Sequence, residues 1–583
     1  MVGIFGSRLE HISPTDYGAK NTLKNSYVEG PLDPPLHSST IGQAFDAAAE
    51  KWHDREALVS CHENKRFSWA QLAERVTAFA RGILAMGFRP GDRLGIWANN
   101  YADWTVAQFG CAKAGIIQVN INPAYRPSEL EFVLNNVGCK GLITGVEFKT
   151  SNYIDMLQQL LPELSECQPG DLHAERMPDL RAVIRLGRET TPGMLNFADV
   201  LNIGRGQPAG FLESIEASLT CDDAINIQFT SGTTGLPKGA TLTHNNILNN
   251  AAIIGNNLLY STKDRVCISV PLYHCFGMVI GNLTSITHGI TMVYPDESFV
   301  AESVLSAISS ERCTSIYGVP TMFLSVLDHP AFGNHDLTSL RTGVMAGAPC
   351  PLELMKRIVS DFHLPEMTIA YGMTETSPVT FQTLPDAPLD KRISSVGRVC
   401  PHTRAKIVDI EDRIVPPNVQ GEIMTAGYCV MKGYWNDEDK TKQAITEDGW
   451  MRTGDLGMFD EDGWLHITGR VKDMIIRGGE NVYPIEIEEF LFSHPKISAV
   501  QVIGIPDEKF GEEIAAWIRL RNGEKATADE IRAFCKGNIA HYKIPKYIRF
   551  VDEFPMTVTG KIQKFEMRNT MIEELGLITP ETA

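Results

Sequence analysis

Long apolar runs are absent from this sequence of 583 residues. A membrane-spanning helix needs about 18 or more apolar residues in succession, and because no such run occurs, no transmembrane segment is predicted. Paired cysteines are absent too: the 12 cysteines are scattered, and none forms a Cys-x-x-Cys pair. This spacing argues against a disulfide framework and against a zinc site, so we expect reduced, mostly buried thiols in an intracellular compartment.

Basic residues are also fewer than acidic residues. The chain has 53 lysines and arginines against 71 acidic residues, which gives a net charge of −18. Because nucleic-acid binding draws most of its affinity from neutralising phosphates, this balance argues against a nucleic-acid partner. It still permits anionic small molecules, which local lysines and helix N-termini can hold. The length exceeds what one hydrophobic core usually supports, so two or more domains are predicted.

Clear targeting signals are lacking at both ends. The first residues, about 30 in number, mix Arg8, Lys20 and Lys24 with Glu10 and Asp16, which is a weak pattern for a transit peptide. The chain ends in Pro-Glu-Thr-Ala rather than in the peroxisomal Ser-Lys-Leu. The two ends therefore leave the compartment open.

Helix-like and strand-like segments alternate from residue 41 onward. Ser68 and Gln71 form a capping-box pattern at the start of a helical repeat. Residues 93–98 predict a strand, 104–114 a helix and 116–121 another strand. Such alternation predicts an α/β fold with parallel sheets. We expect an N-terminal extension over residues 1–40, followed by a large N-terminal domain of several subdomains over 41–470, with two parallel-type sheets and a β-rich part.

The pattern changes to short strands after about residue 400. A turn sequence at residues 460–463 predicts a hairpin. Strands are expected at 500–505 and 515–520, and Thr527 with Glu530 forms a second capping-box pattern before a helix. We therefore predict a small α+β C-terminal domain over residues 471–583.

The strongest local motif runs from Thr230 to Gly239 and reads Thr-Ser-Gly-Thr-Thr-Gly-Leu-Pro-Lys-Gly. Its glycines let the backbone approach an anion closely, and its hydroxyls and the Lys238 ammonium supply donors, so a triphosphate is the predicted ligand. It is not a Walker A loop, because Pro237 stands where that pattern requires glycine. We expect it to follow a strand at 225–229 and to precede a helix from His244. An ordinary flexible loop is the simpler alternative.

This decapeptide resembles the signature of the adenylate-forming superfamily, which contains acyl-CoA synthetases, peptide-synthetase adenylation domains and beetle luciferases. The run from Tyr371 to Thr376 resembles a second motif of that superfamily. The resemblance implies that Glu375 holds Mg²⁺, a hard cation that keeps few protein ligands, and that Thr374 contacts phosphate. A solvated surface charge is the alternative for an isolated glutamate.

Further motifs of the superfamily follow in the expected order. Residues 453–455 resemble its ribose-binding motif, with Arg470 as a second ribose contact. Lys472 matches its hinge residue, and residues 478–480 match the loop that lines the tunnel for the thiol. Lys561 matches its adenylation lysine, whose charge would offset the repulsion between a carboxylate and the α-phosphate.

Two more segments complete the implied site. Residues 346–349 resemble the adenine-side loop, and residues 271–277 resemble the segment that gates the acyl pocket. His274 is the gate candidate, and a hydrogen-bonded core histidine is the alternative. The implied catalytic residues are Lys561, Glu375, Thr230 and Lys238, and Glu375 is also the implied metal ligand. The implied nucleotide-binding residues are Thr230, Ser231, Gly232, Thr233, Thr234, Gly235, Leu236, Pro237, Lys238, Ala346, Gly347, Ala348, Tyr371, Gly372, Thr374, Asp455, Arg470 and Lys561. The implied acyl-substrate residues are His274, Phe276, Gly277, Gly318, Val319 and Met373, and the implied hinge and coenzyme A residues are Lys472, Gly478, Gly479 and Glu480.

The resemblance spans roughly Ile41 to Leu575 and is nearest to the medium-chain acyl-CoA synthetases of the mitochondrial kind. It implies ATP-dependent ligation of a carboxylic acid to coenzyme A through an acyl-AMP, with Mg²⁺ as the metal and a mobile C-terminal domain. We predict a medium-chain fatty acid as the substrate and the mitochondrial matrix as the location, with cytoplasm and peroxisome as alternatives. A luciferase-like oxygenase and a non-catalytic nucleotide-binding scaffold are the alternative functions, and the oligomeric state stays open.

Overall fold

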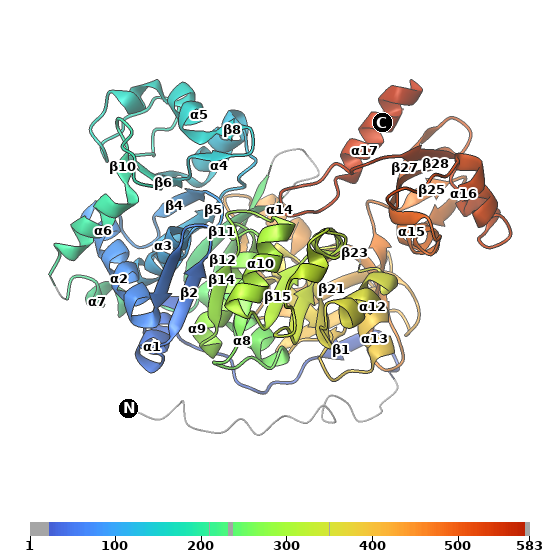
Figure 1. Cartoon of the computed structure of the whole chain (residues 1–583), viewed down its shortest axis with the longest axis horizontal. Coiled ribbons are helices and arrows are strands. Elements are labelled where there is room, and N and C mark those ends of the chain that lie inside the picture. Colours follow the sequence, from blue (N-terminus) through green and yellow to red (C-terminus); the bar gives the residue numbers. More distant parts are fainter. Residues whose placement is uncertain (1–22, 209, 231–236, 349, 578–583) are drawn as a thin grey trace.

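The computed structural model describes residues 23–208, 210–230, 237–348 and 350–577. Residues 231–236, which were predicted to hold phosphate, lie outside these ranges. Among the described residues, no helix is both long and apolar enough to cross a bilayer. Two large sheets form the body of the molecule, and the C-terminal elements form a separate lobe above it, drawn in red (Figure 1).

The first large sheet carries the strand that leads into the predicted phosphate loop. Its central strands β6, β4, β5 and β11 are parallel, and β12 and β22 continue the sheet in antiparallel pairing. In spatial order the strands are β10 (Leu195–Asn196), β9 (Ala182–Arg185), β6 (Cys139–Thr144), β4 (Arg93–Trp97), β5 (Ile117–Asn120), β11 (Ala224–Thr230), β12 (Lys238–Thr243) and β22 (Gly433–Tyr434).

The second large sheet is parallel at its centre and antiparallel at both edges. In spatial order its strands are β19 (Arg398–Val399), β18 (Val379–Gln382), β17 (Glu366–Gly372), β16 (Thr342–Met345), β15 (Ser315–Gly318), β13 (Arg265–Ile268), β14 (Thr291–Tyr294), β2 (Glu56–Ser60) and β3 (Lys65–Ser68). The predicted α/β class is therefore confirmed, with the correction that both large sheets are mixed. Short connections account for part of the difference, because the pairs β11–β12, β2–β3 and β17–β18 are consecutive in the chain and a short connection can join only antiparallel strands.

Helices with the expected capping signals cover these sheets. Ser68 caps α2 in a reciprocal capping box with Gln71, as predicted, and Thr40 and Gln43 form a similar box at α1. The helices of this part of the chain include α1 (Ile41–Lys51), α2 (Trp69–Ala85), α3 (Ala102–Ala114), α8 (His244–Asn257), η3 (Phe276–Leu283, a π-helix), α11 (Pro320–Leu327), α12 (Leu352–Asp361) and the short 3₁₀ helix η5 (Thr374–Thr376).

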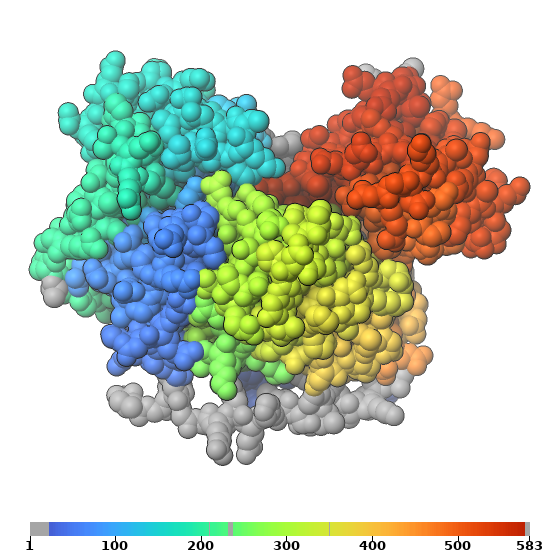
Figure 2. All heavy atoms as spheres, in the orientation of Figure 1, coloured from blue at the N-terminus to red at the C-terminus, as the bar shows by residue number. Residues whose placement is uncertain are grey.

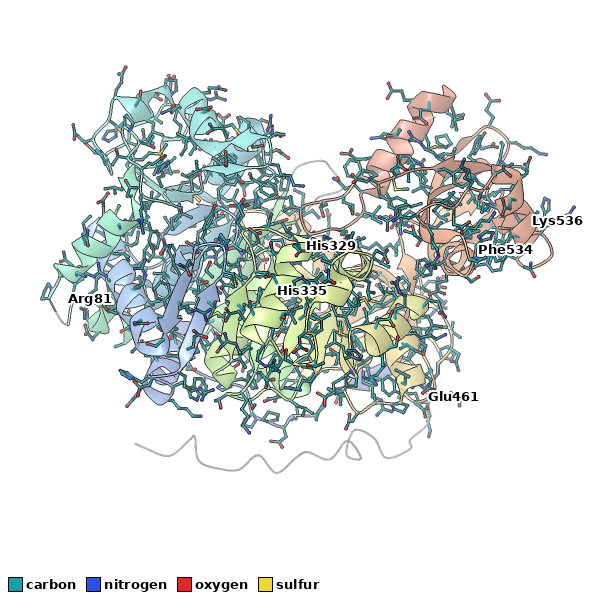
Figure 3. All side chains as sticks on the ribbon, in the orientation of Figure 1. Arg81, His329, His335, Glu461, Phe534 and Lys536 are labelled. Atoms are coloured by element: carbon teal, nitrogen blue, oxygen red, sulfur yellow. The ribbon has the colours of Figure 1, made fainter. Side chains whose placement is uncertain are left out.

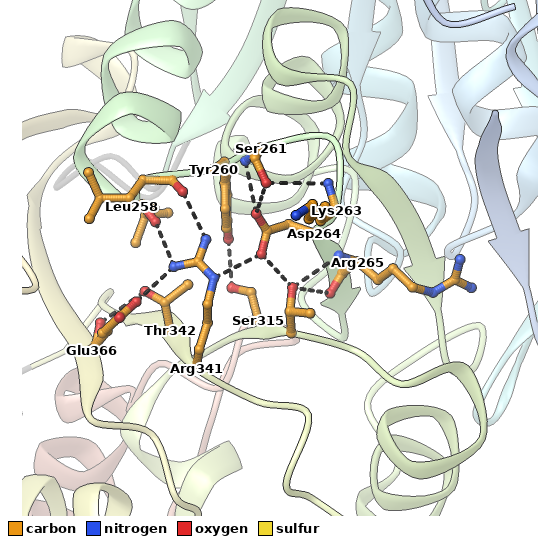
Figure 4. A network of polar contacts seen from close by, with 12 residues as sticks. Leu258, Tyr260, Ser261, Lys263, Asp264, Arg265, Ser315, Arg341, Thr342 and Glu366 are labelled. Atoms are coloured by element: carbon orange, nitrogen blue, oxygen red, sulfur yellow. Dashed lines mark hydrogen bonds and ion pairs between the residues drawn. The ribbon is translucent and has the colours of Figure 1, made fainter. Parts of the chain in front are cut away.

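The base of the second sheet is held by Arg341, which directly precedes β16 (Figure 4). Its guanidinium pairs with Asp264 Oδ1 at 3.0 Å and with Glu366 Oε2 at 2.7 Å. It also donates to the carbonyl oxygens of Leu258 and Leu259, which follow α8. These bonds join the amino ends of three strands to one helix end, so the opposite, carboxyl edge has a rigid support.

The C-terminal third of the chain is richer in antiparallel strands. A third sheet contains β1 (Tyr27–Glu29), β20 (Thr403–Val408), β21 (Gly421–Gly427), β23 (Met451–Phe459) and β24 (Leu465–Arg470), and β23 and β24 flank the turn predicted at 460–463. Its edge strand β1 comes from the predicted N-terminal extension. The last sheet contains β26 (Glu480–Val482), β25 (Ile475–Arg477), β28 (Gly511–Leu520), β27 (Ile497–Asp507) and β29 (Tyr547–Phe550), packed with α15 (Pro484–Phe492), α16 (Ala528–Cys535) and α17 (Lys564–Leu575).

This C-terminal lobe has its own hydrophobic cores. The two clusters of buried apolar side chains within residues 475–577 are built, among the described residues, from that segment alone. In the space-filling view the red lobe stands apart from the teal lobe of the N-terminal part, with a hollow between them (Figure 2). At α16, Thr527 accepts from the Glu530 backbone N–H, as half of the predicted capping box requires.

Candidate active site

The predicted phosphate loop joins two strands of a hairpin. Strand β11 ends at Thr230, strand β12 begins at Lys238, and these two residues are paired in an antiparallel register. The predicted strand before the loop and the predicted helix from His244 are both confirmed as β11 and α8, and the structure adds β12 between the loop and α8. Residues 239–243 of β12 are all buried, so the strand has no alternating pattern that could be recognised in the sequence.

Glu375 is the buried carboxylate of this region, with 5% of its surface exposed. Its Oε1 accepts from the Thr230 hydroxyl at 3.0 Å and from the Tyr434 hydroxyl at 2.9 Å. Both described bonds use the same oxygen atom, and the carboxylate lies at the carboxyl edge where the two large sheets meet. A buried carboxylate beside a phosphate loop fits Mg²⁺, which takes one or two carboxylates together with substrate phosphates and water.

Lys238 stands on the opposite strand of the same hairpin. Its ammonium lies 5.0 Å from the centre of the Tyr434 ring. Partial burial lowers the pKa of Lys238, and the nearby Lys472 ammonium lowers it further. The two ammonium groups repel each other when the site holds no anion. A bound polyanion would offset this repulsion, so the position favours a polyanion.

The predicted ribose carboxylate, Asp455, is contacted by two other predicted nucleotide-binding residues. Asp455 on β23 and Arg470 on β24 are paired across the hairpin, and Arg470 Nε lies 2.8 Å from Asp455 Oδ1. The Tyr371 hydroxyl donates to Asp455 Oδ2 at 2.7 Å. Burial, with the neighbouring Asp455 charge, raises the pKa of Tyr371 well above its usual value. The Asp455 carboxylate is thus fixed in orientation, and a fixed carboxylate can accept bonds from ribose hydroxyls.

Lys561 reaches this same region from the C-terminal lobe. Lys561 is exposed, and partial withdrawal of its ammonium from water is the main reason that its pKa falls to about 8. Arg470 lowers the pKa further, while Asp455 and Glu375 act in the opposite direction. Lys561 therefore shares one electrostatic environment with the predicted ribose residues and the predicted metal ligand.

The turn that carries Lys561 is docked on the N-terminal part of the chain. The Thr321 hydroxyl donates to the Gly560 carbonyl oxygen at 3.4 Å. Gly560 has a φ of +77°, and a Cβ atom on it would come within 2.8 Å of Val319 Cγ2. Val558, on the same turn, lines a small cavity together with Met322 of α11. A larger residue here would need the Val319 side chain to move and would strain the left-handed backbone.

The predicted thiol loop lies outside the site in this arrangement, whereas the charge of the predicted hinge residue acts on Lys238. Lys472 lies two residues beyond the end of β24 and is exposed. Gly478 and Gly479 have φ values of +61° and +87° and form a two-residue turn between β25 and β26. This glycine pair and Glu480 are exposed, whereas the Lys561 turn contacts the N-terminal part.

The acyl-gate segment is almost entirely buried. His274 Nδ1 accepts from the Phe276 backbone N–H at 3.1 Å. Burial, together with the Lys561 charge, lowers the pKa of His274 to about 4, so the ring is neutral at pH 7. The Phe276 ring lies 5.9 Å from the Tyr317 ring, and a Cβ atom on Gly277 would come within 2.4 Å of the Pro271 oxygen. The structure therefore places His274, Phe276 and Gly277 close together where a tight turn enters η3.

The remaining predicted residues lie at the ends of adjacent strands. Gly318 ends β15 and accepts a hydrogen bond from the Ala346 backbone N–H at 3.3 Å. Gly347 has a φ of +83° and faces Val319. A Cβ atom on Gly372 would come within 1.8 Å of the Pro378 oxygen, so this position requires glycine. The structure also describes Pro237, Ala348, Met373 and Thr374, and leaves Ser231, Gly232, Thr233, Thr234, Gly235 and Leu236 outside its described ranges.

The sequence matches the AMP-binding enzyme family over residues 45–435, and the C-terminal domain of AMP-binding enzymes over residues 486–561. The first match encloses both large sheets, and the second ends at Lys561, whose pKa is affected by the charges of Glu375 and Asp455. The chain belongs to the AMP-binding enzyme family. The resemblance to adenylate-forming enzymes is thereby confirmed.

Named relatives of this AMP-binding enzyme cover almost its whole length. A protein of Mus musculus named medium-chain acyl-CoA ligase ACSF2, mitochondrial, is 49% identical over 95% of this chain and 91% of its own. The putative acyl-CoA synthetase YngI of Bacillus subtilis is 45% identical over 93% of this chain and 99% of its own. Among solved structures, an anthranilate CoA ligase, AuaEII, in complex with anthranoyl-AMP superposes with a TM-score of 0.82 at 27% identity, covering 94% of this chain and 99% of that one.

One contact residue of this AMP-binding enzyme was missed by the sequence analysis. Tyr434 donates to Glu375 and stacks beneath Lys238, although it lies 59 residues beyond Glu375. No local pattern around Tyr434 indicates this, because its position follows from the pairing of β22 with β12. Only the sheet order places its hydroxyl against the carboxylate.

Proposed function

We propose that this protein is an ATP-dependent acid–thiol ligase that converts a carboxylic acid, ATP and coenzyme A into an acyl-CoA, AMP and pyrophosphate. The observation that carries the proposal is the position of Lys561. A lysine from the C-terminal lobe stands in the same charged environment as Glu375, Asp455 and Arg470 of the N-terminal part. Membership of the AMP-binding enzyme family and the names of the relatives support the same reaction.

In the first half-reaction an oxygen of the acid attacks the α-phosphorus of ATP, and the bond to the β-phosphate oxygen breaks to release pyrophosphate. Neither reactant needs a protein nucleophile, so the protein contributes positioning and charge. Asp455 would hold the ribose, Lys238 and the hairpin loop would hold the phosphates, and Lys561 would offset the charge that builds up between acid and α-phosphate. Mg²⁺ held by Glu375 would neutralise the departing phosphates.

In the second half-reaction the sulfur of coenzyme A attacks the acyl carbon of the acyl-AMP. The carbon–oxygen bond to AMP breaks, the thiol loses its proton, and AMP leaves. Lys561 and the thiol cannot occupy the same approach at the same time, so the C-terminal lobe must turn between the two steps. We assign Lys472 as the hinge, and the exposed Gly478–Glu480 turn as the element that moves into the site.

We propose a medium-chain fatty acid as the substrate. The gate residues Phe276, Val319 and Met373 are apolar, which suits an aliphatic chain, and the named mammalian relative is a medium-chain ligase. That relative is also named mitochondrial, which supports a mitochondrial location for this protein. An acidic side chain to hold an amino group, as an amino-acid substrate requires, is not among the gate candidates.

The test is pyrophosphate release with ATP and Mg²⁺ across straight-chain acids from acetate to palmitate, with and without coenzyme A. We expect turnover in one band of chain lengths, acceleration by coenzyme A, and loss of adenylation in Lys561→Ala. The matched control is Lys536→Ala, since Lys536 lies exposed at the far edge of the C-terminal lobe (Figure 3). Absence of pyrophosphate release with every acid, while ATP still binds, would contradict the proposal and favour a nucleotide-binding scaffold.

A further inference from the structure

Four buried amide side chains line one face of the neighbouring strands β5 and β11. Gln118 and Asn120 lie on β5, directly opposite Asn226 and Gln228 on β11. Each of the four residues is at most 3% exposed. Residues two positions apart on a strand share one face of the sheet, and the four amides are hydrogen bonded to one another in a continuous ladder.

Asn120 uses its full hydrogen-bonding capacity in this ladder. Its Oδ1 accepts from Gln118 Nε2 at 2.8 Å and from Asn226 Nδ2 at 3.0 Å. Its Nδ2 donates to the Tyr273 carbonyl oxygen at 2.8 Å and to Met278 Sδ at 3.2 Å. A primary amide offers two N–H donors and two oxygen lone pairs, so this side chain is fully satisfied and has one orientation.

The two acceptors of Asn120 lie on either side of the gate candidate. Tyr273 directly precedes His274, and Met278 lies in the π-helix η3 that begins at Phe276. Gln228 Nε2 adds a second donor to Met278 Sδ at 3.2 Å. Such π-helical turns are rare and occur frequently at functional sites. One asparagine on β5 therefore holds both ends of the turn that carries His274.

The beginning of the same segment is held from the end of another strand. Asn100, just after β4, donates through Nδ2 to the Val270 carbonyl oxygen at 3.0 Å. Its Oδ1 accepts from the Leu272 backbone N–H at 2.8 Å. The gate segment is thus hydrogen bonded to residues at the carboxyl edge of the first sheet, although it follows β13, which belongs to the second sheet.

We infer that Asn120 is a positioning residue for acyl selection, which fixes the gate segment relative to the strand that carries the phosphate hairpin. This inference rests on the proposed function and names a residue that adjusts its substrate range. The ladder reaches β11, whose last residue Thr230 contacts Glu375. Discrimination between acids that differ by one methylene group is only about 10–200-fold, so a small displacement of the gate is enough to change it.

The test variant is Asn120→Asp, which keeps the shape and the accepting oxygen but replaces the amide that donates to Tyr273 and Met278. We measure kcat and KM for hexanoate, octanoate, decanoate and dodecanoate. We expect the ratio of kcat/KM between the best and the neighbouring acids to change by about tenfold, because the gate loses two buried bonds. The KM for ATP should stay within about twofold, since no ATP contact is removed.

Two control variants separate positioning from a general loss of stability. Gln118→Met removes a ladder partner from the same strand face but leaves both gate bonds of Asn120 intact, so the chain-length ratios should not change. Asn250→Asp makes the same chemical change at a buried asparagine, 1% exposed, that binds the Val379 backbone instead of the gate. It should lower the thermal unfolding midpoint without changing the ratios.

If Asn120→Asp does not fold, Gln228→Met is measured in its place, because it removes the second donor to Met278. It should shift the chain-length ratios in the same direction by a smaller factor. Unchanged ratios in the folded variant, with a loss of stability like that of Asn250→Asp, would overturn the inference. A wild-type protein that turns over no straight-chain acid contradicts the proposed function itself, and that outcome is distinct from unchanged ratios.

Discussion

The Thr230 hydroxyl donates a hydrogen bond to Glu375 Oε1 at 3.0 Å, although 145 residues separate the two in the chain. Thr230 ends β11 in the first large sheet, and Glu375 lies in η5 just after β17 of the second. The contact therefore joins the phosphate hairpin of one sheet to the buried carboxylate of the other. A triphosphate bound at this seam would touch both sheets, and its metal would lie beside the carboxylate.

The rate of adenylation should fall as the pH rises through about 8. Lys561 has a pKa of about 8, lowered by withdrawal from water and by Arg470. Its charged form, which the reaction needs, dominates below that value and is lost above it. We expect kcat/KM for ATP to decrease up to tenfold per pH unit above about pH 8, because that parameter reports the free enzyme.

Lys561→Arg provides the control for this pH dependence. Arginine stays charged throughout the range, so the variant should be slower at pH 7 but lose the decrease above pH 8. The apparent pKa in kcat should be higher than in kcat/KM, because bound triphosphate favours the ammonium form. A wild-type profile that is flat from pH 7 to pH 9.5 would rule out Lys561 as the titrating group.

Removal of the Glu375 charge should weaken the use of magnesium. Glu375→Gln keeps the oxygen that accepts from Thr230 and Tyr434 but lowers the charge available to the cation. We expect the Mg²⁺ concentration for half-maximal rate to rise by about tenfold or more, since Mg²⁺ sites depend on few carboxylates. Tyr434→Phe removes one hydrogen bond and should produce a smaller change, of about fivefold.

This magnesium prediction can be checked without catalysis. Calorimetric titration of ATP into each variant, with and without Mg²⁺, measures the contribution of the metal directly. The affinity of wild type should increase on addition of Mg²⁺, and that of Glu375→Gln should increase much less. Equal gains in both proteins would mean that the metal is bound elsewhere.

Loss of the Asp455 carboxylate should remove the preference for a ribose over a deoxyribose. The carboxylate is oriented by Arg470 at 2.8 Å and by Tyr371 at 2.7 Å. Asp455→Ala should raise the KM for ATP by about tenfold or more and have much less effect on 2′-deoxy-ATP, because a charged hydrogen bond to the hydroxyl is lost. The comparison of kcat/KM for the two nucleotides in both proteins is the measurement. An equal loss for both would place Asp455 away from the 2′-hydroxyl.

Substitution of Gly560 should slow adenylation selectively. A Cβ atom there would come within 2.8 Å of Val319, so Gly560→Ala should disturb the docking of the Lys561 turn. Adenylation, measured as pyrophosphate release, should fall by about tenfold or more, because small misplacements of a catalytic group are costly. Thioester formation from pre-formed acyl-AMP should be nearly unchanged, since in the proposed mechanism the turn leaves the site for that step.

Gly537→Ala is the matched control for Gly560→Ala. Gly537 also lies in the C-terminal lobe and has a φ of +82°, but a Cβ atom on it would meet no described residue within 4 Å apart from its chain neighbours. Both variants should therefore lose about 1 kcal/mol of stability from the left-handed backbone, but only Gly560→Ala should lose adenylation. Equal rates in the two variants would show that the docking contact is not needed.

The sequence was sufficient for features that depend on short segments. The capping box of Ser68 and Gln71 was predicted, because its partners are three residues apart and need no tertiary contact. The hairpin at residues 460–463 was predicted for the same reason. The family was also evident from the sequence, since each of its motifs is a contiguous run of residues.

Contacts between distant segments could not be predicted in this way. The strand before the phosphate loop and the helix from His244 were predicted, but β12 between them was not, because its residues are buried without alternation and the strand is defined by its pairing with β11 and β22. Tyr434 reaches Glu375 through that pairing, and Asn120 reaches Tyr273 through the approach of one sheet to a segment of the other.

The sequence by itself thus determined the family and the α/β class, and it predicted the chemical types at the site: a phosphate loop, a carboxylate for a metal, a carboxylate for a ribose and a lysine near the C-terminus. The tertiary structure decided how they are arranged, and it docked the Lys561 turn of the C-terminal lobe on the body, where the charges of Glu375 and Asp455 act on the pKa of Lys561. The physical reason is that hydrogen-bond capacity and charge belong to single residues, whereas burial, pKa and distance depend on sheet order and lobe docking.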